Sequence, residues 1–205
     1  MSKYDYIIIG GGAAGLLLAD ALGKDPFFAS KSILVLDKDD KSKNDRTWCF
    51  WERGIGRFDD LIHKTWNHIY VGGQKFQQST SIAPYTYKML RGIDFYDHFV
   101  PRVKAYPNVT WIQEEVQQFE EHKHEVVVTT VTQEFTGQTV FSSLYDPSLP
   151  LKQSKFPVLQ QHFLGWHIKT DRSVFNRSEA TFMDFSVPQK GNTRFMYTLP
   201  FSETE

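Results

Sequence analysis

Three glycines near the start of the chain have the spacing of a phosphate-binding turn. Gly10, Gly12 and Gly15 form the pattern G-x-G-x-x-G between an apolar run and a stretch rich in Ala and Leu. In such a turn the first glycine makes the bend, the second lets the backbone approach a pyrophosphate, and the third allows a helix to pack closely on a strand. The helix start, at Ala13 and Ala14, then offers backbone N–H groups to the phosphate. The pattern predicts a dinucleotide site, and a glycine-rich packing turn is the alternative.

A carboxylate follows at the distance that a ribose contact needs. Asp37 ends the second apolar run, 22 positions after Gly15, where its side chain can accept hydrogen bonds from both ribose hydroxyls. An acidic residue there disfavours a 2′-phosphate, so NADP is not expected at this site. The motif begins ten residues from Met1, and the residues that follow do not form a compact dehydrogenase domain. Both features favour FAD over NAD.

The elements that position these residues follow from hydrophobic periodicity. Residues 4–9 and 32–36 are expected to be strands, residues 13–22 a buried helix, and residues 38–46 a solvated loop. Further along, the pattern predicts a helix over residues 85–105, with Leu90, Ile93 and Val100 at helical spacing. Strands are expected over residues 108–112 and 125–132, and residues 133–143 are expected to turn at Gly137.

A second sheet is expected from the remaining segments. Residues 68–81 resemble a hairpin around Gly72 and Gly73. The aromatic-rich runs are typical of an antiparallel sheet with one buried face; they cover residues 161–169, 181–187 and 194–201. Residues 146–157 hold three prolines and mark the clearest boundary.

Composition narrows the class of protein. The chain has 205 residues, 40% of them hydrophobic, and a net charge of −1, which argues against a general nucleic-acid binder. Cys49 is the single cysteine, so a reducing, cytoplasmic location is expected. Aromatic residues reach 15%, which suggests a large apolar binding surface or a core rich in rings. The motif H-x-H at His122 and His124 is best explained as a solvated turn, and no metal site is expected.

Five motifs along the chain are informative when they are taken together. Two of them are specific, RTWCFWE within residues 44–52 and RFMYTLPFS at residues 194–202. The others are GGGAAG at residues 10–15, QHFLGW at residues 161–166 and FMDF at residues 182–185. With these motifs the chain resembles one family of enzymes, the flavin-dependent lycopene beta-cyclases of the bacterial type. The resemblance implies an α/β fold in which a Rossmann-like FAD-binding domain is interleaved with an antiparallel β-sheet substrate domain, similar to aromatic hydroxylases and geranylgeranyl reductases.

The resemblance also divides the chain. Residues 1–66 and 84–146 are expected to form the FAD-binding domain, and residues 67–83 and 147–205 part of the substrate sheet. In the family a Glu-rich segment credited with protonation follows the LPFS-type stretch. The chain is therefore expected to be C-terminally truncated and to lack this acid.

The reaction that the resemblance implies has no net redox change. With reduced FAD present, and NADPH as the external reductant, an acid protonates a terminal double bond of lycopene. The resulting cation closes a β-ionone ring and loses a proton, which leads towards γ- and β-carotene. Such a cation needs a dry pocket and the faces of aromatic rings.

Candidate site residues follow from matching these motifs. Glu52 and Asp184 are the candidate acids, and a solvated carboxylate is the alternative for each. The aromatic candidates are Trp48, Phe50 and Trp51, with core packing as the alternative. Arg46 and Arg91 are expected to neutralise FAD phosphates, and Val116 matches a strand end that pairs with adenine in the wider fold.

Two other functions stay open at this point. A redox flavoenzyme of the same fold, such as a monooxygenase or a prenyl reductase, would consume NAD(P)H. A non-catalytic fragment would bind FAD without turnover. For the cyclase, a C40 hydrocarbon substrate implies peripheral attachment to the inner membrane surface, and association with other carotenoid enzymes is possible.

Overall fold

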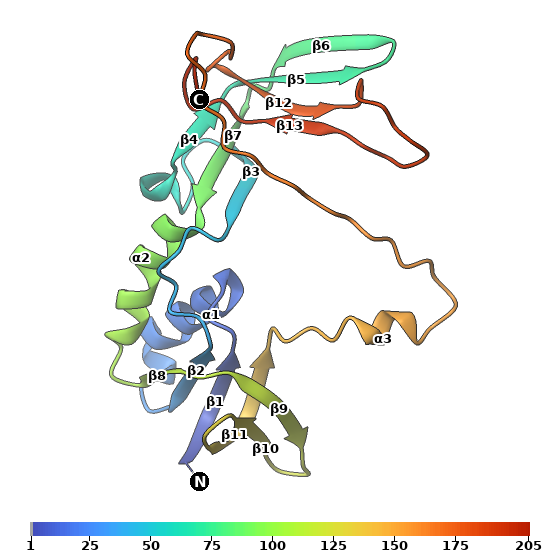
Figure 1. Cartoon of the computed structure of the whole chain (residues 1–205). Helices are drawn as coiled ribbons and strands as arrows, with labels where there is room; N and C mark the ends of the chain where they lie inside the picture. Colours follow the sequence, from blue (N-terminus) through green and yellow to red (C-terminus); the bar gives the residue numbers. More distant parts are fainter. Residues whose placement is uncertain (1) are drawn as a thin grey trace. The chain divides into compact units, whose positions relative to one another are not determined.

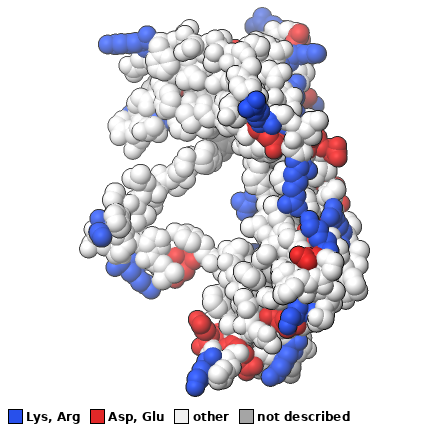
Figure 2. Space-filling model, turned by 180° about the vertical axis from the view of Figure 1, so that it is seen from behind, with Lys and Arg blue, Asp and Glu red and all other residues white. Residues whose placement is uncertain are grey.

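The computed structural model describes residues 2–205 and divides into two compact units (Figure 1). The first unit comprises the chain up to Asn44 together with Ile93–Gln160, and the second comprises Asp45–Gly92 and Gln161–Glu205. On the face shown in Figure 2, Lys and Arg side chains lie beside Asp and Glu side chains. This mixing agrees with the nearly balanced charge of the sequence.

The first unit is built on a six-stranded sheet in the order β8-β2-β1-β11-β10-β9. The four strands β8, β2, β1 and β11 are parallel, and β10 and β9 continue the sheet antiparallel. The bounds are β1 Ser2–Ile9, β2 Ile33–Asp37, β8 Val109–Gln113, β9 Val116–Glu121, β10 Val126–Thr130 and β11 Glu134–Ser142. The helices of this unit are α1 Ala13–Lys24, η1 Pro26–Phe28 and α3 Ser148–Leu151, with most of α2 Gly92–Lys104.

Continuous apolar runs explain the central strands of this sheet. All five residues of β2 are buried, as are the last three residues of β1. Ile7, Ile9, Leu34 and Leu36 pack together with Phe135 of β11 in one core. Strands of parallel sheets are covered on both faces, which favours unbroken Ile, Leu and Val over alternation. The predicted strand–turn–helix–strand unit is therefore confirmed.

The second unit holds two smaller sheets. One has the antiparallel order β3-β7-β4, with β3 Thr47–Arg53, β4 Lys64–Trp66 and β7 Tyr85–Arg91. The other has the order β13-β12-β5-β6, with β5 His68–Gly73, β6 Phe76–Ser81, β12 Glu179–Asp184 and β13 Met196–Thr198. The short helix η2 covers Asp59–Leu61. Trp66, Tyr87, Met89 and Ala180 form the core of this unit.

The prediction of one helix over residues 85–105 is wrong in its first third. Residues 85–91 form β7, and only Gly92–Lys104 is helical. Tyr87 and Met89 enter the core from β7, which lies between β3 and β4 and whose residues 87–90 are all buried. Pairing with two neighbouring strands and burial in the core prevailed over the helical spacing of Leu90 and Ile93.

Gly137 does not turn the chain. It lies inside β11, where a Cβ would come 2.9 Å from the Ile7 side chain of β1. The glycine therefore allows close packing of neighbouring strands. Gly72 and Gly73 likewise belong to β5, and the hairpin turns one step later, since Gly73 pairs with Phe76.

The expected antiparallel sheet also differs from the structure. Residues 161–169 form neither helix nor strand and are mostly exposed. The other two runs form β12 and β13, which are shorter than predicted. β12 runs parallel to β5 and antiparallel to β13, so the sheet is mixed. The sequence pattern indicates strands but carries no information on which partner a strand finds.

The boundaries of the compact units lie elsewhere than the predicted domain boundaries. Residues 45–66 and 84–92 belong to the second unit, because β3, β7 and β4 form one sheet. Residues 147–160 cluster with the first unit. The assignment of a cofactor to one part and a substrate to the other stays a prediction.

Candidate functional site

The glycine turn between β1 and α1 leaves its middle glycine open. Gly10 has a φ of +100°, and a Cβ there would meet the Ser143 hydroxyl at 1.9 Å. A Cβ on Gly15 would lie 1.9 Å from the carbonyl oxygen of Gly10, because α1 begins directly against the end of β1. At Gly12, by contrast, nothing lies within 4 Å of a Cβ. The two outer glycines are required by packing, and the middle one borders space in which a ligand fits.

The N-cap residue of α1 does not cap the backbone N–H groups that begin the helix. Gly12 is the N-cap and provides no side-chain cap, and no acidic residue lies in the first turn. The N–H groups that begin a helix carry partial positive charge and bind anions. Gly12, Ala13 and Ala14 thus fit a diphosphate, as the sequence predicts.

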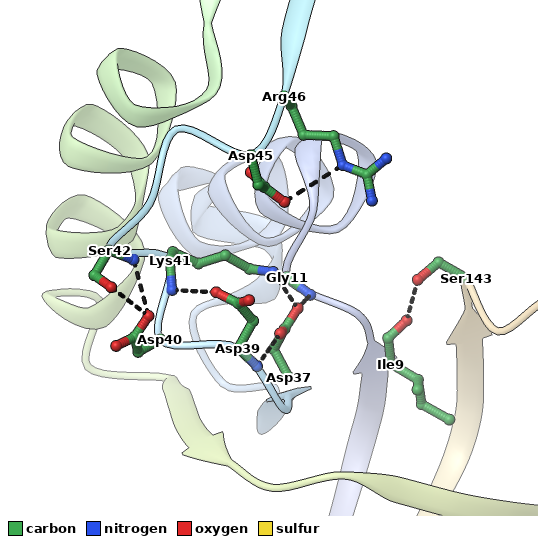
Figure 3. A network of polar contacts seen from close by, with 10 residues as sticks. All are labelled: Ile9, Gly11, Asp37, Asp39, Asp40, Lys41, Ser42, Asp45, Arg46 and Ser143. Atoms are coloured by element: carbon green, nitrogen blue, oxygen red, sulfur yellow. Dashed lines mark hydrogen bonds and ion pairs between the residues drawn. The ribbon is translucent and has the colours of Figure 1, made fainter. Parts of the chain in front are cut away.

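Asp37, at the end of β2, turns its carboxylate to this same turn (Figure 3). Its Oδ2 accepts a short hydrogen bond from the backbone N–H of Gly11, and its Oδ1 accepts one of 2.7 Å from the N–H of Asp39. The ammonium of Lys41 lies 3.0 Å from Oδ2. Asp37 is 8% exposed. The structure therefore brings the predicted ribose acceptor to the glycine turn.

An indole ring completes the surroundings of this turn. A Cβ on Gly11 would come 2.5 Å from the ring of Trp111, on β8, and 3.2 Å from Asp37. The Lys104 ammonium lies over the same indole ring, 5.2 Å from its centroid. Sequence reasoning did not select Trp111, although its position one strand beyond Asp37 in the parallel order is a usable signal.

The remaining cofactor candidates have other surroundings. Arg46 and Arg91 belong to the second unit. Arg46 pairs with Asp45 at 3.5 Å, and its carbonyl oxygen accepts a hydrogen bond from Gly92. Val116 begins β9 and packs into the core of the first unit. Their contacts with FAD stay predictions.

The motif TWCFWER forms β3, and a strand splits its side chains between two faces. Cys49 packs on the core of the second unit, and Trp51 contacts Tyr87 of that core, with ring centroids 5.0 Å apart. Trp48, Phe50 and Glu52 occupy the alternate positions. The structure therefore does not bring the three aromatic candidates of this motif together.

Trp51 instead joins aromatic residues from other strands. Its ring lies 5.1 Å from that of Phe182 on β12, and Phe182 lies 5.7 Å from Tyr87 and 5.9 Å from Tyr197. Trp51 and Tyr197 are 39% and 38% exposed, so this aromatic cluster has an open side. Burial raises the pKa of the Tyr87 hydroxyl, and the neighbouring Cys49 adds to the rise. Tyr87 is therefore the uncharged phenol at neutral pH.

Glu52 is a counter-ion in the structure. The ammonium of Lys88, which is 4% exposed, lies 3.0 Å from Glu52 Oε2 and 2.5 Å from Asp59 Oδ1. It also donates to the carbonyl oxygen of Gly54 at 3.0 Å. Lys88 and Asp59 were not selected from the sequence, although a lysine inside the apolar run of β7 signals a buried partner.

Asp184 ends β12 and is tied to the turn that follows. The Ser186 side chain and the Ser186 backbone N–H, which donates to Asp184 Oδ1 at 2.9 Å, hold the pKa of this carboxyl below its usual value. A general acid needs the opposite shift, because it must carry a proton at neutral pH. Among residues 2–205, moreover, no cluster of three or more potential ligands could bind a metal.

A family model described as lycopene cyclase protein matches residues 5–205, almost the whole chain. The chain belongs to the lycopene cyclase family. No curated protein matches this family member. Within the described residues, none of its helices has both the length and the apolar character to cross a membrane.

Solved structures share the fold of this lycopene cyclase family member at low identity. The p-nitrophenol 4-monooxygenase PnpA of Pseudomonas putida is 17% identical, with a TM-score of 0.52 over 69% of this chain and 41% of its own. A mutant of PqsL of P. aeruginosa is 12% identical, with a TM-score of 0.56. The match covers 79% of this chain and 48% of the PqsL chain. Another PqsL structure, described as a probable FAD-dependent monooxygenase, has 10% identity and a TM-score of 0.49. That match covers 68% of this chain and 42% of the PqsL chain.

These similarities show the α/β, Rossmann-like fold that the sequence predicts. The chain spans less than half the length of each of these structures.

Proposed function

We propose that the protein carrying this chain is a flavin-dependent lycopene beta-cyclase. It would convert the ψ-ends of lycopene to β-ionone rings and so produce γ-carotene and β-carotene. The observation that carries the proposal is the family match, which extends over residues 5–205 and includes both specific motifs. A ring closure of this kind is an isomerisation, because the atoms of the substrate are all kept.

The glycine turn supports FAD as the cofactor. Gly10, Gly12 and Gly15, with the start of α1, would hold the diphosphate, and Asp37 would hold the ribose. The fold is shared with PqsL, which is described as a probable FAD-dependent monooxygenase. Reduced FAD, with NADPH as the external electron donor, supplies an electron-rich ring system that stabilises positive charge nearby.

The aromatic cluster suits the stabilisation of a carbocation. Trp51, Tyr87 and Phe182 present ring faces and edges within 5.0–5.7 Å of one another. A cation over such faces is stabilised by the ring quadrupole, by about 2 kcal/mol when water is excluded. Trp48 and Phe50 lie on alternate positions of β3, on the strand face opposite to Trp51.

The structure of the described residues favours neither candidate acid. Glu52 already neutralises Lys88, and Asp184 has a lowered pKa. We therefore expect Glu52→Gln and Asp184→Asn to retain cyclisation. Loss of cyclisation in a folded Asp184→Asn enzyme would restore Asp184 as the acid.

Expression of the complete reading frame in a bacterial host that accumulates lycopene tests the proposal. We expect a new pigment with the mass of lycopene and with β-rings, resolved by chromatography and mass spectrometry. Unchanged lycopene in the presence of folded, flavin-loaded protein would contradict the cyclase. A product whose mass differs from that of lycopene would support a redox flavoenzyme of the same fold.

We also propose that the protein works at the cytoplasmic surface of the inner membrane, where a C40 hydrocarbon resides. Phe163, Leu164 and Trp166 are 71–84% exposed in a segment without regular structure, and apolar side chains of this kind insert into lipid interfaces. Cosedimentation with liposomes should be lost when these three residues are replaced by serine. Equal cosedimentation of both forms would exclude this segment as the contact.

A further inference from the structure

We propose that the side chain of Lys41 occupies the ribose position of Asp37 and is displaced when a nucleotide binds. Lys41 would then be a specificity-determining residue, because it determines how much binding affinity the ribose hydroxyls of a nucleotide contribute. The inference rests on the dinucleotide site proposed above, and it concerns binding alone. Cyclisation of lycopene is not needed to test it.

The loop after β2 carries Lys41 back onto the strand end. Lys41 has a φ of +60°, a left-handed conformation that residues other than glycine adopt rarely and at a cost. Its ammonium lies 3.0 Å from Asp37 Oδ2 and 5.6 Å from the centroid of the Tyr96 ring on α2. The side chains of Lys41 and Asp37 are only 11% and 7% exposed. The ion pair is thus largely withdrawn from water.

The carboxylate of Asp37 has too few free acceptor positions to bind a ribose while Lys41 stays in place. A carboxylate offers about four lone-pair positions, and three are engaged, by the N–H of Gly11, the N–H of Asp39 and the ammonium of Lys41. Accepting both hydroxyls of a ribose needs two positions, so one present donor must leave. Of the three donors, only the ammonium is at the end of a flexible side chain.

The backbone of the loop has its own supports. The N–H of Lys41 donates to Asp39 Oδ1 at 2.6 Å, and both the N–H and the hydroxyl of Ser42 donate to Asp40 Oδ1 (Figure 3). None of these hydrogen bonds involves the Lys41 ammonium. The loop can therefore keep its course when the ammonium leaves Asp37 or is removed by substitution.

Displacement of the ammonium costs free energy, and this cost is subtracted from nucleotide affinity. Hydrogen bonds to charged groups are stronger than those between neutral groups, but the released ammonium regains hydration, so only part of this contribution is lost. We expect Lys41→Met, which keeps the length of the side chain without its charge, to strengthen the ribose contact about fivefold.

The test compares two competitors of FAD on the 205-residue chain. FAD binding is followed by quenching of flavin fluorescence, and ADP or 2′,3′-dideoxy-ADP is titrated as competitor. Both competitors carry the same diphosphate, so a change in their affinity ratio reports the ribose hydroxyls and not the overall charge. In Lys41→Met the preference for ADP over the dideoxy compound should rise about fivefold over that of the unaltered chain.

Two further variants make the outcome specific. Lys38→Met removes the same charge from the same loop, but Lys38 pairs with Glu115 at 3.0 Å, so the affinity ratio should stay as in the unaltered chain. The double variant Asp37→Asn/Lys41→Met should have the same ratio of ADP affinity to dideoxy-ADP affinity as the single variant Asp37→Asn. A ratio that is unchanged or lower in Lys41→Met would overturn the inference while leaving FAD binding and the proposed cyclase intact. Absence of FAD binding by the unaltered chain would reject the dinucleotide site itself.

Discussion

Two lysines of this chain lie away from water, and each is held by carboxylates. Lys41 has the single carboxylate of Asp37, whereas Lys88 has Glu52 and Asp59. Burial by itself lowers the pKa of Lys88, but Asp59 and Glu52 outweigh this effect and raise it. Lys88 therefore stays charged, and its surroundings in β7 depend on both partners.

The two ways of breaking this cluster should have unequal effects. In Glu52→Gln/Asp59→Asn an ammonium that is 4% exposed loses both counter-ions, which is the costly case for a buried pair. In Lys88→Met the carboxylates remain, and each is about a third exposed and can be hydrated. We expect the double variant to lower the thermal unfolding midpoint by about 8 °C, and Lys88→Met by less than half of that. Equal shifts in calorimetry would contradict this account of Lys88.

The same cluster predicts a dependence of stability on pH. The hydrogen bond from Lys88 holds the pKa of the Asp59 carboxyl below its usual value. The unfolded chain therefore binds a proton more readily than the folded one, so this contribution is present above about pH 4 and is lost as the pH falls further. When denaturant unfolding is measured between about pH 5 and pH 3, the free energy of unfolding of Asp59→Asn should fall less than that of the unaltered chain. An identical loss would assign the acid sensitivity to other carboxylates.

At the scale of elements, the close approach of α1 to β1 forms the glycine turn of the proposed nucleotide site. The helix can begin at Ala13 only because Gly15 allows its backbone to touch Gly10. The parallel pairing of β2 with β1 then places Asp37 beside the turn. A sequence pattern predicted each of these elements, but the network of Asp37 with Lys41 requires the loop between β2 and β3 to fold back.

Two alanine substitutions in the glycine turn should separate folding from binding. Gly12→Ala adds a methyl group where nothing lies within 4 Å, so the unfolding midpoint should stay within about 2 °C while FAD affinity falls about tenfold. Gly15→Ala places its methyl group 1.9 Å from a backbone oxygen and should lower the midpoint by about 6 °C or more. Fluorescence titration and calorimetry measure both. Unimpaired FAD binding by Gly12→Ala would contradict a diphosphate beside Gly12.

At the scale of the whole molecule, the chain passes between its two compact units three times. The passages lie after Asn44, after Gly92 and after Gln160. The first two lie beside regular elements, whereas the third falls in a long stretch, residues 152–169, without helix or strand. Segments that lack backbone pairing open at low free-energy cost.

Limited proteolysis should therefore begin in this third passage. Lys152 and Lys155 are exposed and offer trypsin its sites. We expect mass spectrometry to find an early fragment that ends at one of these lysines, with its complement, before any other cut. An early cut inside β1, β2 or β7 would show that the strands are less stable than their burial indicates.

The sequence by itself determined the local features of this protein. The glycine spacing, the continuous apolar strands and Asp37 are encoded within 37 residues, because each rests on backbone conformation or on hydrophobic periodicity. The motif residues likewise sufficed to indicate the family, which the match over residues 5–205 confirms.

Only the tertiary structure decided which of the other candidates meet. Alternation along β3 places Trp51 with Tyr87 and Phe182, and pairs Glu52 with a lysine 36 residues away. The tertiary structure also makes residues 85–91 a strand where a helix was predicted, and it pairs β12 with β5 in parallel. Strand partners and ion pairs depend on contacts between distant residues, and neither periodicity nor propensity of a single segment contains that information.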